Sequence, residues 1–113
     1  MSTDWKVCFF NTRLERDVLA LPAGLLARFP GYSERLETSG PDLGMPRTKA
    51  LGKGLFELRL NAEEGIARVL YCTTPNRRVV MLHQFVKKSQ RTPPGALETA
   101  RRRMKEIANA WLP

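Results

Sequence analysis

The N-terminal third of the chain changes its hydrophobic pattern once. Residues 6–11, which read Lys-Val-Cys-Phe-Phe-Asn, form a short apolar run rich in residues that favour strands. After this run, apolar side chains recur at helical spacing, as in Leu14, Val18 and Leu21, and the stripe continues to about Thr38. The pattern therefore predicts one strand followed by one or two helices.

Proline and glycine divide the next part of the chain. Pro30 and Gly31 predict a kink or break in the second helix, because proline removes a backbone donor and clashes with the preceding turn. Residues 39–46 have the composition of turns throughout. Neither side of this segment is large enough to fold alone, so we interpret it as a loop within one domain that spans residues 1–113.

The second half begins with three runs that alternate or concentrate apolar residues as strands do. These runs cover residues 54–60, 66–73 and 78–86, and the turns between them fall at residues 61–65 and 74–77. Tight turns between successive strands are typical of an antiparallel meander.

A final helix follows, with Thr92 as its predicted cap and Pro93 in its first turn. Its apolar stripe runs from Leu97 to Trp111. The element order predicts an α+β fold with one antiparallel sheet, two N-terminal helices and a C-terminal helix, all packed on one face of the sheet.

The composition favours a folded domain and argues against a membrane-spanning, secreted or disulfide-rich protein. The 113 residues are 42% hydrophobic and 27% charged, which is ordinary for a folded soluble domain. No apolar run approaches the 18 residues of a membrane span, and the first residues contain no apolar segment of a secretory signal. Only two cysteines are present, Cys8 and Cys72, so we expect reduced thiols in a cytoplasmic protein rather than a disulfide scaffold.

The net charge of +8 is unevenly distributed. Residues 1–46 carry five Lys and Arg against six Asp and Glu, whereas residues 47–113 carry fourteen against five. Repeated contacts with phosphates suit such a distribution, so nucleic acid is the first candidate partner. An acidic protein partner and simple solubility are the alternatives.

Most catalytic motifs are missing from the sequence. It contains no phosphate-binding loop of the G-x-x-x-x-G-K-[ST] type and no G-x-S-x-G elbow. A single histidine and two distant cysteines do not make a zinc pattern. We therefore expect neither a metal nor another cofactor.

The cationic residues supply the candidate site. Arg59 and Arg68 interrupt apolar strands, and a buried arginine must reach solvent, find a carboxylate such as Glu57, or serve a site. If Arg59 and Arg68 converge with Lys87 and Lys88, they can hold a phosphodiester. The remaining predicted RNA contacts are Lys49, Lys53, Tyr71, Gln90 and Arg91.

Two of these candidates have a second interpretation. His83, expected on the same face as Val79, Met81 and Phe85, is either a partly buried core residue or a general acid or base. Tyr71 either stacks on a base or belongs to the core or its rim. The basic run at residues 101–105 is likewise either a solvated helix face or an RNA contact.

The chain also resembles a known family. Five segments carry the resemblance, and they are residues 42–46, 51–59, 68–71, 82–93 and 100–105. Together they are similar to the phage-derived HigB-like toxins of the RelE/ParE superfamily. The resemblance covers the chain from about residue 5. It departs from the family at Pro30-Gly31, at Gln84 in place of a frequent glycine, and at Phe56 in place of a tryptophan.

The resemblance implies a compact RelE-like domain that is the toxin of a type II toxin–antitoxin system. A helix-turn-helix antitoxin would be its partner, and its activity would be ribosome-dependent cleavage of mRNA without a metal. The family's matching positions assign catalytic roles to Arg59, Arg68, His83, Lys87 and Lys88.

Two other functions remain open at this stage. Related toxins of the same fold block a protein target such as gyrase, and a phage nucleic-acid-binding module without catalysis would carry the same charge pattern.

Overall fold

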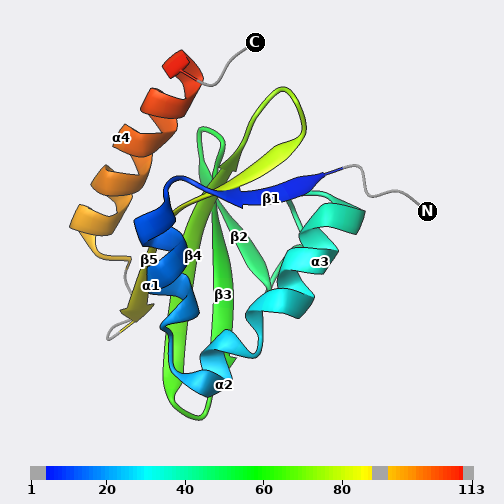
Figure 1. The fold of residues 1–113 in the computed structure, drawn as a ribbon, viewed down its shortest axis with the longest axis vertical. Helices are drawn as coiled ribbons and strands as arrows, with labels where there is room; N and C mark the ends of the chain where they lie inside the picture. Colours follow the sequence, from blue (N-terminus) through cyan, green and yellow to red (C-terminus); the bar gives the residue numbers. More distant parts are fainter. Residues whose placement is uncertain (1–4, 88–91, 111–113) are drawn as a thin grey trace.

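A computed structural model describes residues 5–87 and 92–110 of the chain. It contains the elements β1 (Lys6–Phe9), α1 (Thr12–Leu19), α2 (Ala23–Leu26), α3 (Phe29–Ser39), β2 (Thr48–Gly52), β3 (Leu55–Ala62), β4 (Gly65–Thr73), β5 (Arg78–Lys87) and α4 (Pro94–Ala110). The predicted α+β class is confirmed, and Figure 1 shows the helices arranged around a single twisted sheet.

The sheet has five strands in the order β1-β5-β4-β3-β2. Strands β3 to β5 form the antiparallel meander that the turns predict, and β2 adds to it as the antiparallel neighbour of β3. Strand β1, by contrast, pairs with β5 in parallel. The sheet is therefore mixed, which corrects the expectation of a purely antiparallel one. Two parallel strands need a long crossover connection, and here residues 10–77, which contain α1 to α3 and β2 to β4, form that connection.

Strand β2 was not predicted. Its five residues are mostly exposed and include only one β-branched side chain, Thr48. Pairing with the edge of β3 holds this segment extended, so its structure depends on a partner strand rather than on its own composition.

Helices cover both faces of the sheet rather than one. The core on one face packs α1 to α3 against the strands, through Leu14, Val18, Leu25, Leu36, Leu58, Leu60, Val69 and Met81 among others. The core on the other face packs α4 against them, through Leu55, Leu70, Val80, Leu82, Ala100 and Ile107. Figure 1 shows α4 following β5 on its own side of the molecule. Both faces of the central strands are therefore buried, which corrects the one-face arrangement.

The helical stripe of the first third is divided in three. Asn11 caps α1 by accepting a hydrogen bond from the Leu14 N–H over 2.8 Å. The break that Pro30 predicts falls before it, between α2 and α3, and the proline lies in the first turn of α3. Its missing N–H has no intrahelical partner to lose there, so α3 continues without a kink at this residue.

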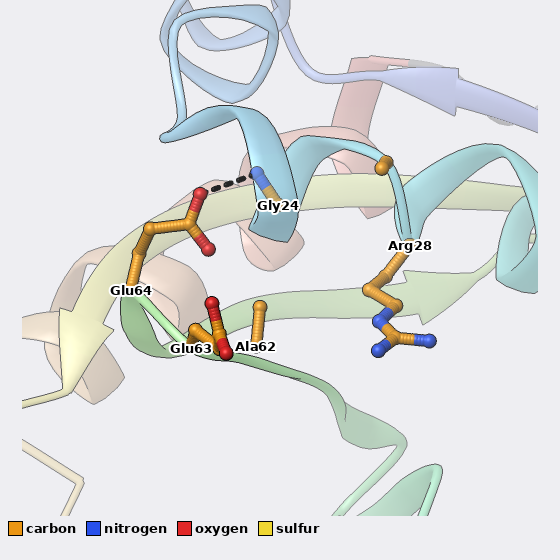
Figure 2. Close-up of a pocket in the computed structure, with 6 residues that line it drawn as sticks. Gly24, Arg28, Ala62, Glu63 and Glu64 are labelled. Atoms are coloured by element: carbon orange, nitrogen blue, oxygen red, sulfur yellow. Dashed lines mark hydrogen bonds between the residues drawn. The ribbon is translucent and has the colours of Figure 1, made fainter.

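The turn between β3 and β4 is tied to α2. The Glu64 carboxylate accepts a hydrogen bond of 2.7 Å from the Gly24 N–H, as Figure 2 shows. In the same view, Arg28 lies on the other side of an open surface pocket from Glu63 and Glu64. The hairpin thereby fixes the start of a four-residue helix that is too short to be stable alone.

Helix α4 begins at Pro94, one residue later than predicted. The Pro93 carbonyl accepts hydrogen bonds from the Ala96 and Leu97 N–H groups at this end of the helix. The Thr92 hydroxyl, predicted as the cap, instead donates to the Glu57 side chain on β3. Within the described part of the chain, no helix combines the length and apolar character needed to cross a membrane.

Candidate functional site

Three neighbouring strands place charged side chains on the α4 face of the sheet. On β3, Leu55 belongs to the α4-side core, so strand alternation places Glu57 and Arg59 on that face as well. On β4, Leu70 belongs to the same core, and Arg68 lies two residues before it. Arg59 and Arg68 are direct cross-strand partners.

The Glu57 carboxylate lies at the centre of this group. Its Oε1 atom is 3.2 Å from Arg68 Nε and 3.7 Å from Arg59 Nε, and its Oε2 atom accepts a 3.1 Å hydrogen bond from the Thr92 hydroxyl. Glu57 is only 3% exposed, so these contacts replace the water that its charge would otherwise bind. A single buried carboxylate therefore fixes two guanidinium groups.

Arg68 is buried almost completely, with 2% of its surface exposed. Its Nη1 donates to the Ala67 carbonyl over 3.1 Å. Its Nε lies close enough to Glu57 for an ion pair but makes no hydrogen bond with any described residue, because the N–H is not aligned with the oxygen. Burial lowers the pKa of Arg68, and the Glu57 charge opposes that change.

Lys87 completes the group from the end of β5. Its strand partner is Ile66, two residues before Arg68 on β4. Burial lowers the pKa of Lys87 first, the charge of Arg68 lowers it further, and Glu57 opposes both. Arg59 and Lys49 also lower it, so the charges of three other cations all act on Lys87. We call Arg59, Arg68, Lys87 and Lys49, gathered around Glu57, the cationic cluster.

The two predicted lysines of the preceding hairpin have different positions. Lys49 on β2 is exposed and pairs across the strands with Glu57, so it lies at the rim of the cluster. Lys53 lies in the exposed turn between β2 and β3, with a φ angle of 53°. Six residues of strand separate it from Arg59, which is about 20 Å. The structure does not bring Lys53 to the cluster.

Tyr71 lies on the opposite face of the sheet. It is fully buried in the core beneath α1 to α3, where its ring stacks on Phe56 and its hydroxyl donates to the Pro41 carbonyl. No face of the ring is open to a base. This corrects the expectation that Tyr71 stacks on RNA and favours its interpretation as a core residue.

His83 also lies outside the cluster. A β-bulge at Leu82 shifts the register of β5, so that His83 pairs with Leu70 while Met81 pairs with Tyr71. Met81 belongs to the core under α1 to α3, whereas the His83 ring lies beside Phe85, 6.4 Å between centroids. The expectation that His83 shares a face with Val79 and Met81 is thereby corrected.

The charges that act on His83 are those of two helices. Burial and the charge of Arg103 lower its pKa, while Asp17 opposes them. The charges that act on His83 therefore come from α1 and α4 and not from the cations at the end of β5.

Three predicted residues, Lys88, Gln90 and Arg91, lie outside the described residues. Thr92, by contrast, was missed as a member of the site. Its threonine-proline sequence resembles a helix cap, and nothing local shows that its hydroxyl reaches a strand 35 residues away.

The cationic cluster has the chemistry of an anion site. Three cations around one buried carboxylate, with a fourth at the rim, carry an excess of positive charge, and an oxyanion would relieve their mutual repulsion. Guanidinium and ammonium groups are suited to phosphate oxygens. Among the described residues, no group of three or more His, Cys, Asp or Glu could hold a metal ion.

Comparison with known proteins agrees with the sequence resemblance at the level of the family. Residues 16–105 match the family described as phage derived protein Gp49-like (DUF891), and a search of curated proteins gave no match. The matched span includes every described member of the cationic cluster together with Glu57 and Thr92. Because the match covers most of the chain, the protein belongs to the phage-derived Gp49-like family, within the RelE/HigB-like group of toxin–antitoxin toxins.

Proposed function

We propose that this protein is the toxin of a type II toxin–antitoxin system and cleaves mRNA on the ribosome, in the cytoplasm. Membership of the Gp49-like family supports the toxin role. The observation that carries the nuclease activity is the convergence of Arg59, Arg68 and Lys87, from three strands, around the buried Glu57.

The proposed reaction requires no metal. The 2′-oxygen of a ribose attacks the adjacent phosphorus, the bond from phosphorus to the 5′-oxygen breaks, and the products carry a 2′,3′-cyclic phosphate and a 5′-hydroxyl. Negative charge grows on the phosphoryl oxygens in the transition state, and fixed cations stabilise it. Arg59 and Arg68 suit this role because Glu57 already holds them in place.

Removal of the 2′-hydroxyl proton is assigned to Lys87, and water supplies the proton that the leaving 5′-oxygen takes up. A base must take the proton of the 2′-hydroxyl, and the 5′-oxygen must receive one as it leaves. A lysine whose pKa is lowered by burial and neighbouring cations has a neutral form available for the first task. His83 supports no such role at the cluster, because its charged neighbours are Arg103 and Asp17.

The partners follow from the same proposal. A small site on a sheet holds little of its substrate, so we propose that the ribosome positions the mRNA. A helix-turn-helix antitoxin encoded beside the toxin would restrain it.

The test is induced expression of the full-length chain in a bacterial host, with the 5′ ends of cellular mRNA mapped. We expect growth arrest with new ends inside translated codons. Arg59→Ala and Lys87→Ala should each restore growth, because the first removes transition-state charge and the second removes the proposed base. Lys6→Ala is the matched control, since Lys6 is an exposed strand lysine on β1. It pairs with the first residue of β5, whereas Lys87 is the last residue of β5.

Circular dichroism of the purified variants shows whether each still folds. Growth arrest with intact mRNA and a DNA-damage response would instead indicate a toxin that blocks a protein such as gyrase. Unimpaired growth with the wild-type chain would contradict any toxin function.

A further inference from the structure

A second polar cleft lies apart from the cationic cluster, where the edge of β5 passes between α1 and α4. Its volume is about 250 Å³, and its polar lining comes from Asn11, Arg13, Asp17, His83, Gln84 and Arg103. Strand β1 pairs with β5 only as far as Met81, so β1 does not cover β5 beyond the bulge. We call this space the His83 cleft. It shares no lining residue with the cationic cluster.

The donors of the His83 cleft are two arginines. Arg103 is fixed in place, because its Nη1 donates to the Leu82 carbonyl over 2.7 Å and its guanidinium lies over the Phe10 ring, 4.9 Å from the centroid. A guanidinium has five N–H groups, so donors remain for a ligand. Arg13 adds a second, exposed guanidinium from the first turn of α1.

The acceptors are an amide and a carboxylate. The Gln84 Oε1 atom is buried and receives no hydrogen bond from any described residue. A buried acceptor without a donor is costly, and a turn of the Gln84 side chain toward the cleft would let the N–H group of a ligand remove that cost. Asp17 lies one helical turn after Arg13 and supplies a carboxylate to the same cleft.

His83 adds a flat ring to the lining of the cleft. Burial and the charge of Arg103 lower its pKa, so the imidazole is neutral at pH 7 and adds no further positive charge. Neutral aromatic rings of this kind stack on bases that are splayed out of a single strand.

We propose that the His83 cleft binds a guanine base of the RNA substrate. Guanine has two adjacent acceptors, O6 and N7, which suit a guanidinium, and two adjacent donors, N1–H and the N2 amino group, which suit a carboxylate or an amide oxygen. Adenine, cytosine and uracil lack such a pair of adjacent donors. The cleft presents both kinds of partner, so guanine satisfies more of its groups than any other base.

The position of the cleft fits one RNA segment that reaches both sites. His83 and Lys87 are four residues apart on β5, which is about 13 Å. Phe85 lies between them and is the strand partner of Arg68. This inference therefore rests on the proposed RNA substrate, and it adds selection of a base to cleavage of the backbone.

The test is nuclear magnetic resonance titration of the purified full-length protein with GMP, AMP, CMP, UMP and inorganic phosphate. We expect GMP to shift the amide signals of residues 11–17 and 82–85 at about one tenth of the concentration that the other nucleotides need. Phosphate alone should leave these signals in place. Equal effects of the four nucleotides, or GMP shifts confined to the cationic cluster, would overturn the proposal.

Two variants sharpen the result. Asp17→Asn and Gln84→Leu should each weaken GMP binding about tenfold, since the first replaces one of the two carboxylate oxygens by a donor NH2 group and the second removes the amide oxygen. Glu98→Gln is the matched control for the first, because it also replaces an exposed helix carboxylate by an amide, on α4, and should bind GMP as the wild type does. Unchanged binding by Asp17→Asn and Gln84→Leu would contradict the assignment.

The same titration separates this inference from the proposed function. GMP binding in the cleft without mRNA cleavage in cells would contradict the proposed nuclease activity but support guanine binding in the cleft. Cleavage of mRNA in cells, with no preference for GMP in the titration, would support the nuclease activity but contradict guanine binding in the cleft.

Discussion

The Glu57 carboxylate holds groups from three separate parts of the chain. It contacts Arg59 on its own strand, Arg68 on β4 and Thr92 before α4. Both Glu57 and Arg68 are almost fully buried, so each charge depends on the other for its stability. At this position the groups that would bind an anion are also groups that stabilise the fold.

Removing the carboxylate should therefore destabilise the protein strongly. Glu57→Ala leaves Arg68 buried without its counter-ion, and we expect a loss of about 3–5 kcal/mol in the free energy of unfolding. Urea denaturation followed by circular dichroism measures it. Glu63→Ala, in an exposed turn, is the control and should change stability by less than about 0.5 kcal/mol. A comparable small change for Glu57→Ala would show that the buried ion pair is unimportant for folding.

The single histidine gives a residue-level test of the His83 cleft. Because the chain contains one histidine, its imidazole signals can be followed without overlap. We expect a pKa below the ordinary value of about 6.5, since burial and Arg103 both disfavour the charged ring. Asp17→Asn should lower this pKa further, because the Asp17 charge opposes the shift, and Arg103→Gln should raise it.

The same shift makes stability depend on pH. The folded-state pKa lies below the unfolded value, so the unfolded chain binds more protons between the two values. The contribution of His83 to stability therefore falls as the pH drops from about 6.5 toward the folded pKa, and His83→Gln should lose that part of the pH dependence. A folded pKa at or above 6.5 would contradict the burial of the ring.

At the scale of elements, local pattern predicted what each segment forms but not what it packs against. Alternation along residues 54–60 placed Glu57 and Arg59 on one face of a strand, and the structure agrees. Alternation fails at His83, because a single inserted residue, Leu82, changes the register and no sequence signal marks the bulge. The burial of Tyr71 could not be predicted either, because it depends on which helices cover the face of the sheet on which Tyr71 lies.

The other differences between the predicted and the observed elements also arise from contacts between distant parts of the chain. The parallel pairing of β1 with β5 is a long-range contact, and the strand β2 exists through its pairing with β3. The sequence predicts Thr92 as a helix cap because the residues after it begin a helix. Its hydroxyl instead donates to the buried Glu57 carboxylate, and a hydrogen bond to a charged acceptor is stronger than one to a neutral group. Tertiary contacts decided each of these cases.

The link between α2 and the β3–β4 hairpin provides a test at this scale. A Cβ atom added to Gly24 would clash with the Glu64 carboxylate, so Gly24→Ala must displace that side chain and break its hydrogen bond. We expect Gly24→Ala and Glu64→Ala each to cost about 1 kcal/mol. The double variant should cost much less than the sum, because both changes remove the same contact. Additive losses in urea denaturation would show that the two residues act independently.

At the scale of the whole molecule, the excess of positive charge is concentrated in residues 47–113. Half of the described cations in this part of the chain are exposed, and there they increase the attraction to any polyanion without selecting one. The cationic cluster differs because Arg59, Arg68 and Lys87 are partly or fully buried, and because the charges of Arg59, Arg68 and Lys49 all lower the pKa of Lys87. Salt dependence of RNA binding can separate these two kinds of charge.

Each phosphate contact to a single strand contributes about 0.7 to the slope of log affinity against log salt concentration. We expect Lys87→Ala to reduce this slope by about 0.7 in binding of a fluorescent single-stranded RNA, measured by anisotropy across a range of salt. Lys6→Ala should leave the slope unchanged, because Lys6 pairs with Arg78, nine residues of strand or about 30 Å from Lys87. Equal reductions in both variants would mean that RNA senses the overall charge of the protein, and the cationic cluster would then have no special part in holding phosphate.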